Sequence, residues 1–270
     1  MATLVLVHGA FAGGWIWAET ASRLARLGHA VHTPTLTGCG DRSHLLHMEV
    51  CFSTHVQDVS QLLFYQDLEG AILVGHDYGG MVAATVAHRL MAKAAGMIYL
   101  DGVIPKRGFS YAGIAGNRLP PKLTSHDKNV WFVPPPSAGS FGLSDESVES
   151  WFSKRLQPFP QLAFTQPNPY GLKVRDLSSA YVRCAGNTDP LAKAMAAQAG
   201  LLGIKRVQLE TGPYPMVTDP GRLAELLGQL AGELAGAASS RIRPEQSGHA
   251  PEIPRSRLKT SQASASSEEA

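Results

Sequence analysis

Cysteine is scarce in this chain: three of its 270 residues, Cys39, Cys51 and Cys184, carry a thiol. Three cysteines cannot make a full disulfide framework, and these three lack the spacing of a metal-binding motif. We therefore expect reduced thiols, as in a cytoplasmic protein, and no metal site.

A large excess of one charge and long hydrophobic runs are also missing. Lys and Arg total 24 and Asp and Glu total 22, which leaves a net charge of +2. The basic residues are scattered rather than striped, so we expect no nucleic-acid partner. No apolar stretch is long enough to span a membrane, and the first residues lead straight into the strand-like run 3–7 without a leader pattern. These absences predict a soluble, cytoplasmic protein with no membrane partner.

Signatures of cofactor binding are absent as well. The sequence has no phosphate-binding loop, and its glycine-rich segment 75–80 lacks the spacing of a dinucleotide fingerprint. We expect no cofactor, and a small molecule as the partner, either as substrate or as ligand. No pattern in the sequence indicates an oligomeric state.

What the chain does have is a regular alternation of short apolar runs and helical patterns. This alternation predicts parallel strands joined by crossover helices, and the length suits one large α/β domain with its own core. The expected strands are 3–7, 29–33, 71–75, 95–100, 179–184 and 205–210. The expected helices are 16–27, 54–66, 79–92, 190–200 and 220–236.

The segment 104–178 interrupts this alternation. It is rich in proline and aromatic residues, and it predicts a small cap over the carboxyl ends of the strands, where open α/β sheets place their ligand sites. The core would then comprise residues 1–103 and 179–237. Large apolar residues are few from 238 to 270, which predicts a disordered tail.

One glycine-flanked turn carries the main chemical signal. The apolar run 71–74 leads into Gly75-His76-Asp77-Tyr78-Gly79-Gly80. This spacing is that of the nucleophile elbow, a sharp strand-to-helix turn that exposes its central side chain above the sheet. The central residue here is Asp77 and not a serine, so an ordinary serine esterase is excluded.

Further motifs accompany the elbow along the chain. They are His8-Gly9-Ala10-Phe11 with Gly13, Gly14, Trp15 and Trp17; the run Leu36 to His44; the run Leu100 to Pro105; and the run Thr211 to Pro220. Together they resemble the compact α/β-hydrolases that include plant methyl esterases, hydroxynitrile lyases and small bacterial esterase-like proteins. The resemblance implies an α/β-hydrolase fold, with a mostly parallel sheet of about six strands, helices on both faces and a small cap insertion.

The resemblance also implies roles for individual residues. The acid of the family's triad matches Asp189, and the oxyanion-hole donors match the backbone N–H groups of Ala10 or Phe11 and of Tyr78. Two positions depart from the family pattern. Asp77 stands at the nucleophile position, and Pro213, which has no ionisable group and no N–H, stands where the family has its histidine.

An aspartate at the elbow also resembles epoxide hydrolases and haloalkane dehalogenases. Their carboxylate forms an ester with the substrate, a histidine activates the water that hydrolyses it, and the epoxide hydrolases use two cap tyrosines as acids. Loss of that base slows water activation by about 10²–10⁴-fold. The candidate tyrosines here are Tyr111 and Tyr170. The candidate replacement base is His249 in the tail, although Phe11 departs from the proline of the epoxide hydrolases.

Other polar residues have structural interpretations beside the catalytic ones. Asp77 is either a functional base or nucleophile, or a cap at a helix N-terminus. Asp189, without a histidine partner, is a vestige, a loop cap or an independent acid. His76 is expected to point into the sheet and His8 to order the oxyanion loop.

Aromatic residues near the expected pocket mouth suggest what binds there. Trp15, Trp131, Tyr111 and Phe109 are the candidate substrate-binding residues, and they would suit a flat, apolar or aromatic metabolite of the kind met in natural-product tailoring. Three hypotheses for function stay open: a cofactor-free enzyme that uses Asp77 for proton transfer or nucleophilic attack, an epoxide or alkyl-halide hydrolase with a displaced histidine, and a ligand-binding pseudo-hydrolase. We expect an atypical enzyme of hydrolase, lyase or cyclase type, rather than the pseudo-hydrolase.

Overall fold

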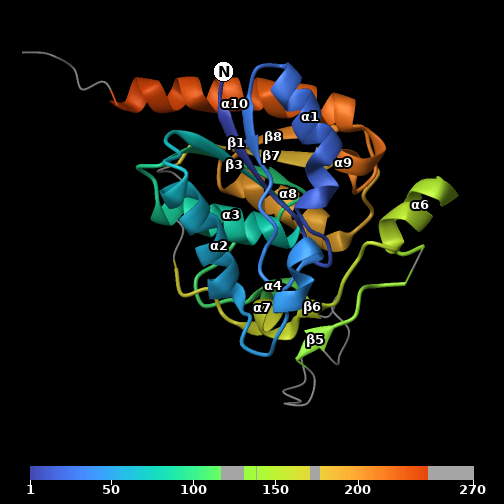
Figure 1. The fold of residues 1–270 in the computed structure, drawn as a ribbon. Coiled ribbons are helices and arrows are strands. Elements are labelled where there is room, and N and C mark those ends of the chain that lie inside the picture. Colours follow the sequence, from blue (N-terminus) through green and yellow to red (C-terminus); the bar gives the residue numbers. More distant parts are fainter. Residues whose placement is uncertain (117–130, 138, 171–176, 243–270) are drawn as a thin grey trace, which may run out of the picture.

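The computed structural model describes residues 1–116, 131–137, 139–170 and 177–242 (Figure 1). Its main sheet has six strands in the order β2-β1-β3-β4-β7-β8, and every neighbouring pair is parallel. The strands are β1 (Thr3–Val7), β2 (Ala30–His32), β3 (Ala71–His76), β4 (Ala94–Leu100), β7 (Ser179–Cys184) and β8 (Lys205–Leu209). The predicted α/β-hydrolase fold is confirmed.

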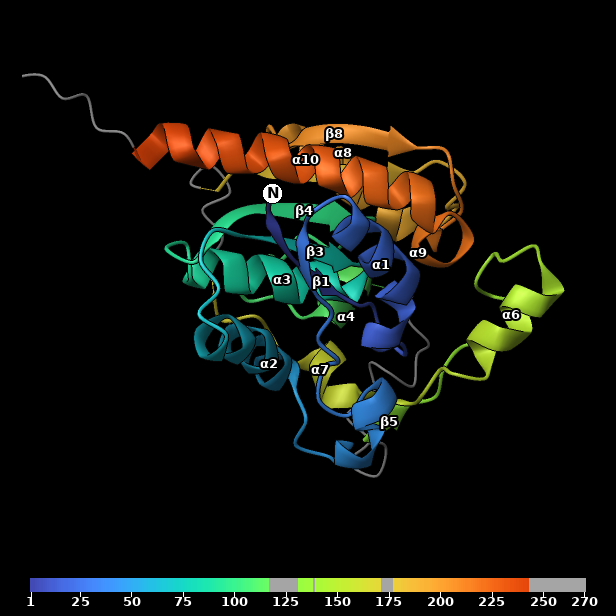
Figure 2. The same cartoon turned by 45° about the horizontal axis from the view of Figure 1, so that its top comes forward.

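Helices cover both faces of the sheet (Figure 2). On one face α1 (Ala18–Arg26) packs beside α10 (Pro220–Ile242), and on the other lie α2 (Phe52–Tyr65), α3 (Tyr78–Arg89) and α8 (Pro190–Leu201). Successive residues of a strand point to opposite faces, so each strand feeds both layers. In β1, for example, Val5 belongs to the core beneath α2 and α3, whereas Leu6 belongs to the core beneath α1 and α10.

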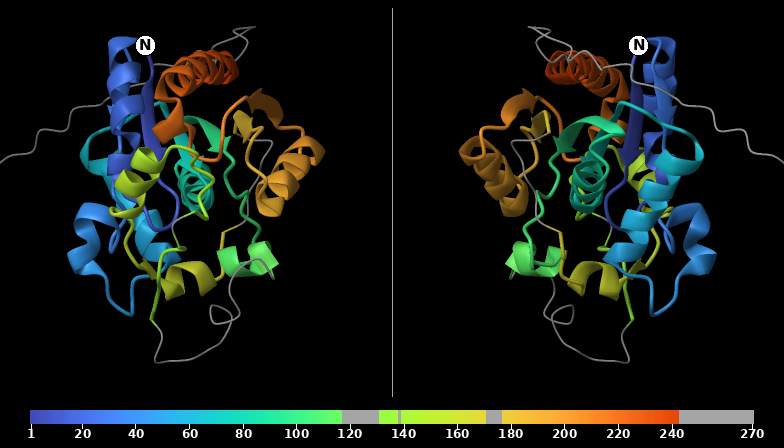
Figure 3. Two further views of the ribbon diagram at one scale, coloured as in Figure 1. Left: turned by 90° about the vertical axis from the view of Figure 1, so that its right-hand side faces the viewer. Right: turned by 90° about the vertical axis from the view of Figure 1, so that its left-hand side faces the viewer.

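The insertion between β4 and β7 consists of short elements. They are α4 (Tyr111–Ala115), β5 (Phe132–Val133), α6 (Glu146–Ser153), β6 (Phe159–Pro160) and α7 (Gln161–Thr165), and β5 pairs antiparallel with β6. Helices α4 and α7 lie side by side at one end of the molecule (Figure 3). Through α4 the insertion reaches the carboxyl end of β3, where the elbow begins.

The last helix is longer than predicted. It ends at Ile242 rather than at residue 236, since the alanines that follow residue 234 favour helix. The predicted tail therefore begins as helix, and its remainder, with His249, lies outside the described residues. Within the described ranges, no helix combines the length and apolar composition that a membrane span requires.

Candidate active site

The elbow forms where β3 passes into α3. Asp77 joins the two elements with φ 48° and ψ −120°, a strained conformation for a residue with a side chain. Glycines permit it, because a Cβ on Gly75 would lie 2.5 Å from the Cα of Gly80, and a Cβ on Gly79 would lie 2.6 Å from the carbonyl oxygen of Val7. The backbone here is therefore held close to β1, as the glycine spacing predicts.

The Asp77 carboxylate does not cap the helix that follows it. It makes no side-chain hydrogen bond to the first turn of α3, which argues against the capping interpretation. Its Oδ1 accepts a hydrogen bond from the Tyr111 hydroxyl at 2.7 Å, and its Oδ2 lies 3.5 Å from the backbone nitrogen of Ala10. Of the two alternative donors in the first loop, Ala10 thus faces the carboxylate, while the Phe11 ring packs against Phe159.

A cavity of about 400 Å³ opens beside this carboxylate. It brings together Asp77, Tyr111, Asp189 and Pro213, four of the residues singled out from the sequence. Its remaining lining residues are His76, Asp101, Ser140, Phe141, Gly142, Gly186, Asn187, Thr188, Leu191, Ala192 and Tyr214. The size suits a small molecule, and the lining is more polar than the predicted aromatic pocket.

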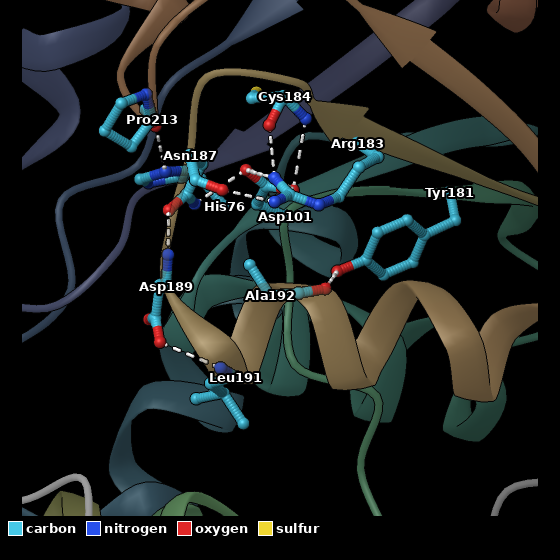
Figure 4. Close-up of polar contacts among 10 residues, drawn as sticks. All are labelled: His76, Asp101, Tyr181, Arg183, Cys184, Asn187, Asp189, Leu191, Ala192 and Pro213. Carbon is cyan, nitrogen blue, oxygen red and sulfur yellow. Dashed lines mark hydrogen bonds and ion pairs between the residues drawn. The ribbon is translucent and has the colours of Figure 1, made fainter.

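The two other triad positions do not form a catalytic pair. Asp189 is exposed, and its Oδ1 accepts a hydrogen bond from the backbone N–H of Leu191 at 2.8 Å, so the side chain caps α8. The Pro213 carbonyl accepts a hydrogen bond from Nε2 of His76 at 3.0 Å (Figure 4). Loop capping, one of the roles considered for Asp189, is the one observed here.

A buried ion pair between Asp101 and Arg183 lies at the cavity, which Asp101 helps to line. Asp101 is 5% exposed, and both of its carboxylate oxygens lie 3.2 Å from one guanidinium nitrogen of Arg183. The Asn187 amide donates a further hydrogen bond to Asp101 at 2.8 Å, as does the backbone N–H of Cys184 at 3.2 Å (Figure 4). Arg183 also donates to the carbonyl oxygens of Cys184 and Asn187. These contacts tie β4 to the loop that carries Asp189.

Three of the four predicted substrate-binding aromatics are not among the residues that line this cavity. Trp15 packs edge-on against Trp151 and lines a separate hollow of about 550 Å³. Phe109 is 41% exposed beneath Lys106, and Trp131 is 36% exposed against Phe132. Tyr111 alone of the four reaches the carboxylate. A binding role for the other three stays a prediction.

The second candidate cap tyrosine also lies elsewhere. The Tyr170 ring is covered by the guanidinium of Arg89 at 4.3 Å. A different tyrosine, Tyr214, lines the cavity, and burial together with the nearby Asp77 and Asp189 charges raises its pKa above the usual value. It follows Pro213 directly, so the motif Thr211 to Pro220 contained the signal that could have identified it.

His76 departs from expectation. The prediction that it points into the sheet is wrong, because its ring lines the cavity and contacts the Pro213 carbonyl. Every residue of β3 is buried, so alternation along this strand does not distinguish a sheet-facing side chain from one at the cavity. In the described part of the chain, no group of three or more His, Cys, Asp or Glu side chains could hold a metal ion.

Two buried histidines fix the loops around the elbow. His8 donates from Nδ1 to the Gly9 carbonyl at 2.7 Å and accepts from the backbone N–H of Leu36 at 3.0 Å, which orders the oxyanion loop as predicted. His55 accepts from the Tyr78 hydroxyl and donates to the Thr37 carbonyl, both at 2.9 Å. Burial lowers the pKa of each histidine from 6.5 to about 4, so both are neutral.

These histidines predict a loss of stability in mild acid. Between pH 6.5 and about 4 the unfolded chain binds protons at both positions while the folded chain does not. The free energy of unfolding should therefore fall as the pH falls through this window, by about 3 kcal/mol for each histidine. Urea denaturation at a series of pH values measures it. The exposed His44 is the matched control, since His44→Gln should leave the profile unchanged, whereas a flat wild-type profile would contradict the prediction.

Comparisons with known proteins agree with this architecture. A sequence profile described as "Alpha/beta hydrolase family" matches residues 4–226. A carbendazim hydrolyzing esterase of Nocardioides sp. is 33% identical over 242 residues, covering 85% of this chain and 100% of that protein. Methylesterase 10 of Arabidopsis thaliana is 25% identical over 253 residues, covering 84% and 90%. An extracellular alpha/beta-hydrolase from a Paenibacillus species superposes with a TM-score of 0.72 at 24% identity, covering 85% of this chain and 98% of that one, and shows the common fold.

Proposed function

The chain belongs to the alpha/beta hydrolase family, and on that premise we propose that it is a cofactor-free hydrolase in which the Asp77 carboxylate attacks a small-molecule substrate. One observation carries the proposal. Asp77 sits in the strained elbow, yet its carboxylate leaves the helix uncapped and faces the cavity between the Tyr111 hydroxyl and the Ala10 N–H. Strained backbone conformations are typical of functional positions, and here the side chain has no helix-capping role that would account for the strain.

The proposed reaction begins when one Asp77 oxygen attacks an electrophilic carbon. For an epoxide, a ring carbon–oxygen bond breaks as the ester bond forms, and the ring oxygen takes the phenolic proton of Tyr111. Burial and the Asp77 charge raise the pKa of Tyr111 well above its usual value, so the hydroxyl keeps its proton until an alkoxide forms beside it. Water then hydrolyses the ester, with the N–H groups of Ala10 and Tyr78 as donors to the oxyanion.

The cavity lining supports a substrate with both apolar and polar parts. Phe141, Leu191 and Ala192 offer apolar contacts to a carbon skeleton, such as that of an aromatic metabolite in natural-product tailoring. Ser140, Thr188 and Asn187 offer hydrogen-bonding groups to its substituents. The relative named for hydrolysing carbendazim supports hydrolysis of small molecules as the reaction class.

The test is to look for the covalent ester. The full chain is mixed with styrene oxide, quenched in acid at increasing times, and analysed by intact mass and peptide mapping. We expect an adduct on the peptide that contains Asp77, and none in the Asp77→Asn variant. Reaction in heavy-oxygen water should label the Asp77 carboxylate after one turnover, since water attacks the acyl carbon.

Absence of an adduct across epoxides, alkyl halides and activated esters, with no product formed, would overturn nucleophilic attack. Proton transfer by Asp77, or ligand binding without chemistry, would then be the better explanations of the same cavity. Both explanations require the compounds to bind in the cavity, and calorimetry with the same compounds measures whether they bind.

A further inference from the structure

The proposed reaction lacks a group to deprotonate water, and His76 is the residue beside Asp77 without an assigned role. It ends β3 and is 4% exposed, and its ring packs edge-on against that of Tyr214 with the ring centres 5.2 Å apart. Pro213, at the family's histidine position, cannot act as a base. A base must therefore come from another element of the fold.

The hydrogen bond to Pro213 fixes the state of the His76 ring. A carbonyl oxygen only accepts hydrogen bonds, so Nε2, 3.0 Å from it, carries the proton of the neutral imidazole. The lone pair is then on Nδ1. The proline that replaces one histidine thus orients another through its backbone.

Nδ1 of His76 and the Asp77 carboxylate lie close to the same glycine. A Cβ placed on Gly9 would lie 3.0 Å from Nδ1 of His76 and 3.3 Å from Oδ2 of Asp77, so both atoms border the same small space beside Gly9. Nδ1 makes no hydrogen bond to another residue in the described ranges. Nδ1 is also not among the buried polar atoms that lack a hydrogen-bond partner in these ranges. This agrees with an atom that is open to the cavity.

We propose that His76, through Nδ1, is the general base that activates water to hydrolyse the Asp77 ester. This inference rests on the proposed function. The water oxygen bonds to the acyl carbon of Asp77 as Nδ1 takes a water proton. The tetrahedral intermediate expels the product alkoxide, which takes that proton from His76. The acid left at Asp77 returns its proton to the Tyr111 phenolate across their hydrogen bond, and the site regains its starting state.

The charges around His76 suit this sequence of steps. Burial lowers the pKa of His76, while the nearby carboxylates of Asp77 and Asp101 oppose the shift. Esterification moves the negative charge from Asp77 to the Tyr111 phenolate, and burial, the largest influence on the imidazole, keeps it neutral when water has to be deprotonated. The Asp101 carboxylate, paired with Arg183, lies near enough to stabilise the imidazolium that forms.

Other candidates fit the role less well. The Oδ1 of Asp189 caps α8, and the side chain is exposed to water that would weaken its action on the ester. The Tyr214 phenol keeps its proton because burial and nearby carboxylates raise its pKa. His249 lies outside the described residues.

The test follows the lifetime of the styrene oxide adduct in His76→Gln. Glutamine can still donate an N–H toward the Pro213 carbonyl, but it supplies no base. We expect the adduct to form on Asp77 at the wild-type rate and to break down about 10²–10⁴-fold more slowly. The matched control is His88→Gln on α3, outside the cavity, where the ring also bonds a backbone carbonyl, that of Ala84. The adduct in this control should clear as in the wild type.

The outcomes separate this inference from the proposed function. An adduct that clears at the wild-type rate in His76→Gln would overturn the role of His76 and leave Asp77 as nucleophile. Slower formation with unchanged breakdown would also overturn it, because that pattern indicates a purely structural histidine. Absence of an adduct in every protein, with epoxides, alkyl halides and activated esters alike, would overturn the proposed function, and this inference with it. If the glutamine variant does not fold, His76→Asn replaces it.

Discussion

Asp77→Asn is expected to lower kcat by at least about 10³-fold while leaving the protein folded. The amide is a poor nucleophile and a poor base, so either use of the carboxylate is lost, and removal of a nucleophile from a catalytic unit reaches effects of about 10⁶-fold. The fold should survive because asparagine tolerates positive φ and its Oδ1 can still accept from the Tyr111 hydroxyl. Steady-state kinetics with a turned-over epoxide, and urea denaturation of the same sample, measure the two effects.

The chain offers a matched control for this substitution. Asp67 also has φ 48°, but it is exposed and does not line the cavity. Asp67→Asn should leave kcat unchanged, which separates loss of the Asp77 carboxylate from a general effect of asparagine at positive φ. Turnover by Asp77→Asn within tenfold of the wild type would refute a chemical role for this side chain.

Arg183→Met is expected to destabilise the protein by about 3–5 kcal/mol. The change leaves the Asp101 carboxylate buried without its cation, and removing one partner of a buried ion pair has effects of this size. The carbonyl oxygens of Cys184 and Asn187 lose a donor as well, so the loop before α8 should loosen. The unfolding free energy in urea at neutral pH measures the loss.

A double variant shows whether the unpaired charge is the cause. Asp101→Asn combined with Arg183→Met removes both charges. The single oxygen of asparagine can still accept the hydrogen bond from the Cys184 N–H, whereas its NH2 group stands where the second carboxylate oxygen accepted from Asn187. We expect the double variant to be more stable than Arg183→Met alone. Equal stability of the two variants would attribute the loss to the lost hydrogen bonds and packing of Arg183.

Much of the fold was predictable because the main strands are buried apolar runs separated by helical patterns. Each of the six predicted strands occurs within a few residues of its expected place, and the glycine spacing located the elbow. Asp189-Pro190 carried the signature of a helix start, an N-cap followed by proline. The structure shows that cap, in place of a catalytic acid.

The cavity lining was harder to predict. The elements of the insertion are short and follow no sheet or helix period long enough to assign an inward face, so Tyr111 could not be distinguished from Phe109, two residues earlier. The direction of His76 was missed because β3 is buried on both faces. Tyr214 was not predicted because it lies in a short loop before the four-residue helix α9 (Pro215–Thr218), where no strand or helix period assigns an inward face.

His76 and Asp77 are consecutive in the sequence, at the end of a strand in the centre of the sheet. A nucleophile and base on separate loops can be pulled apart by any motion of either loop. In the reaction proposed above, one peptide unit joins the nucleophile and the base, and the Pro213 carbonyl selects the tautomer of the imidazole. The two residues can therefore be transferred together. Grafting a few residues of strand and turn would place both groups in register in another elbow, provided that the new site has a backbone carbonyl to accept from the imidazole.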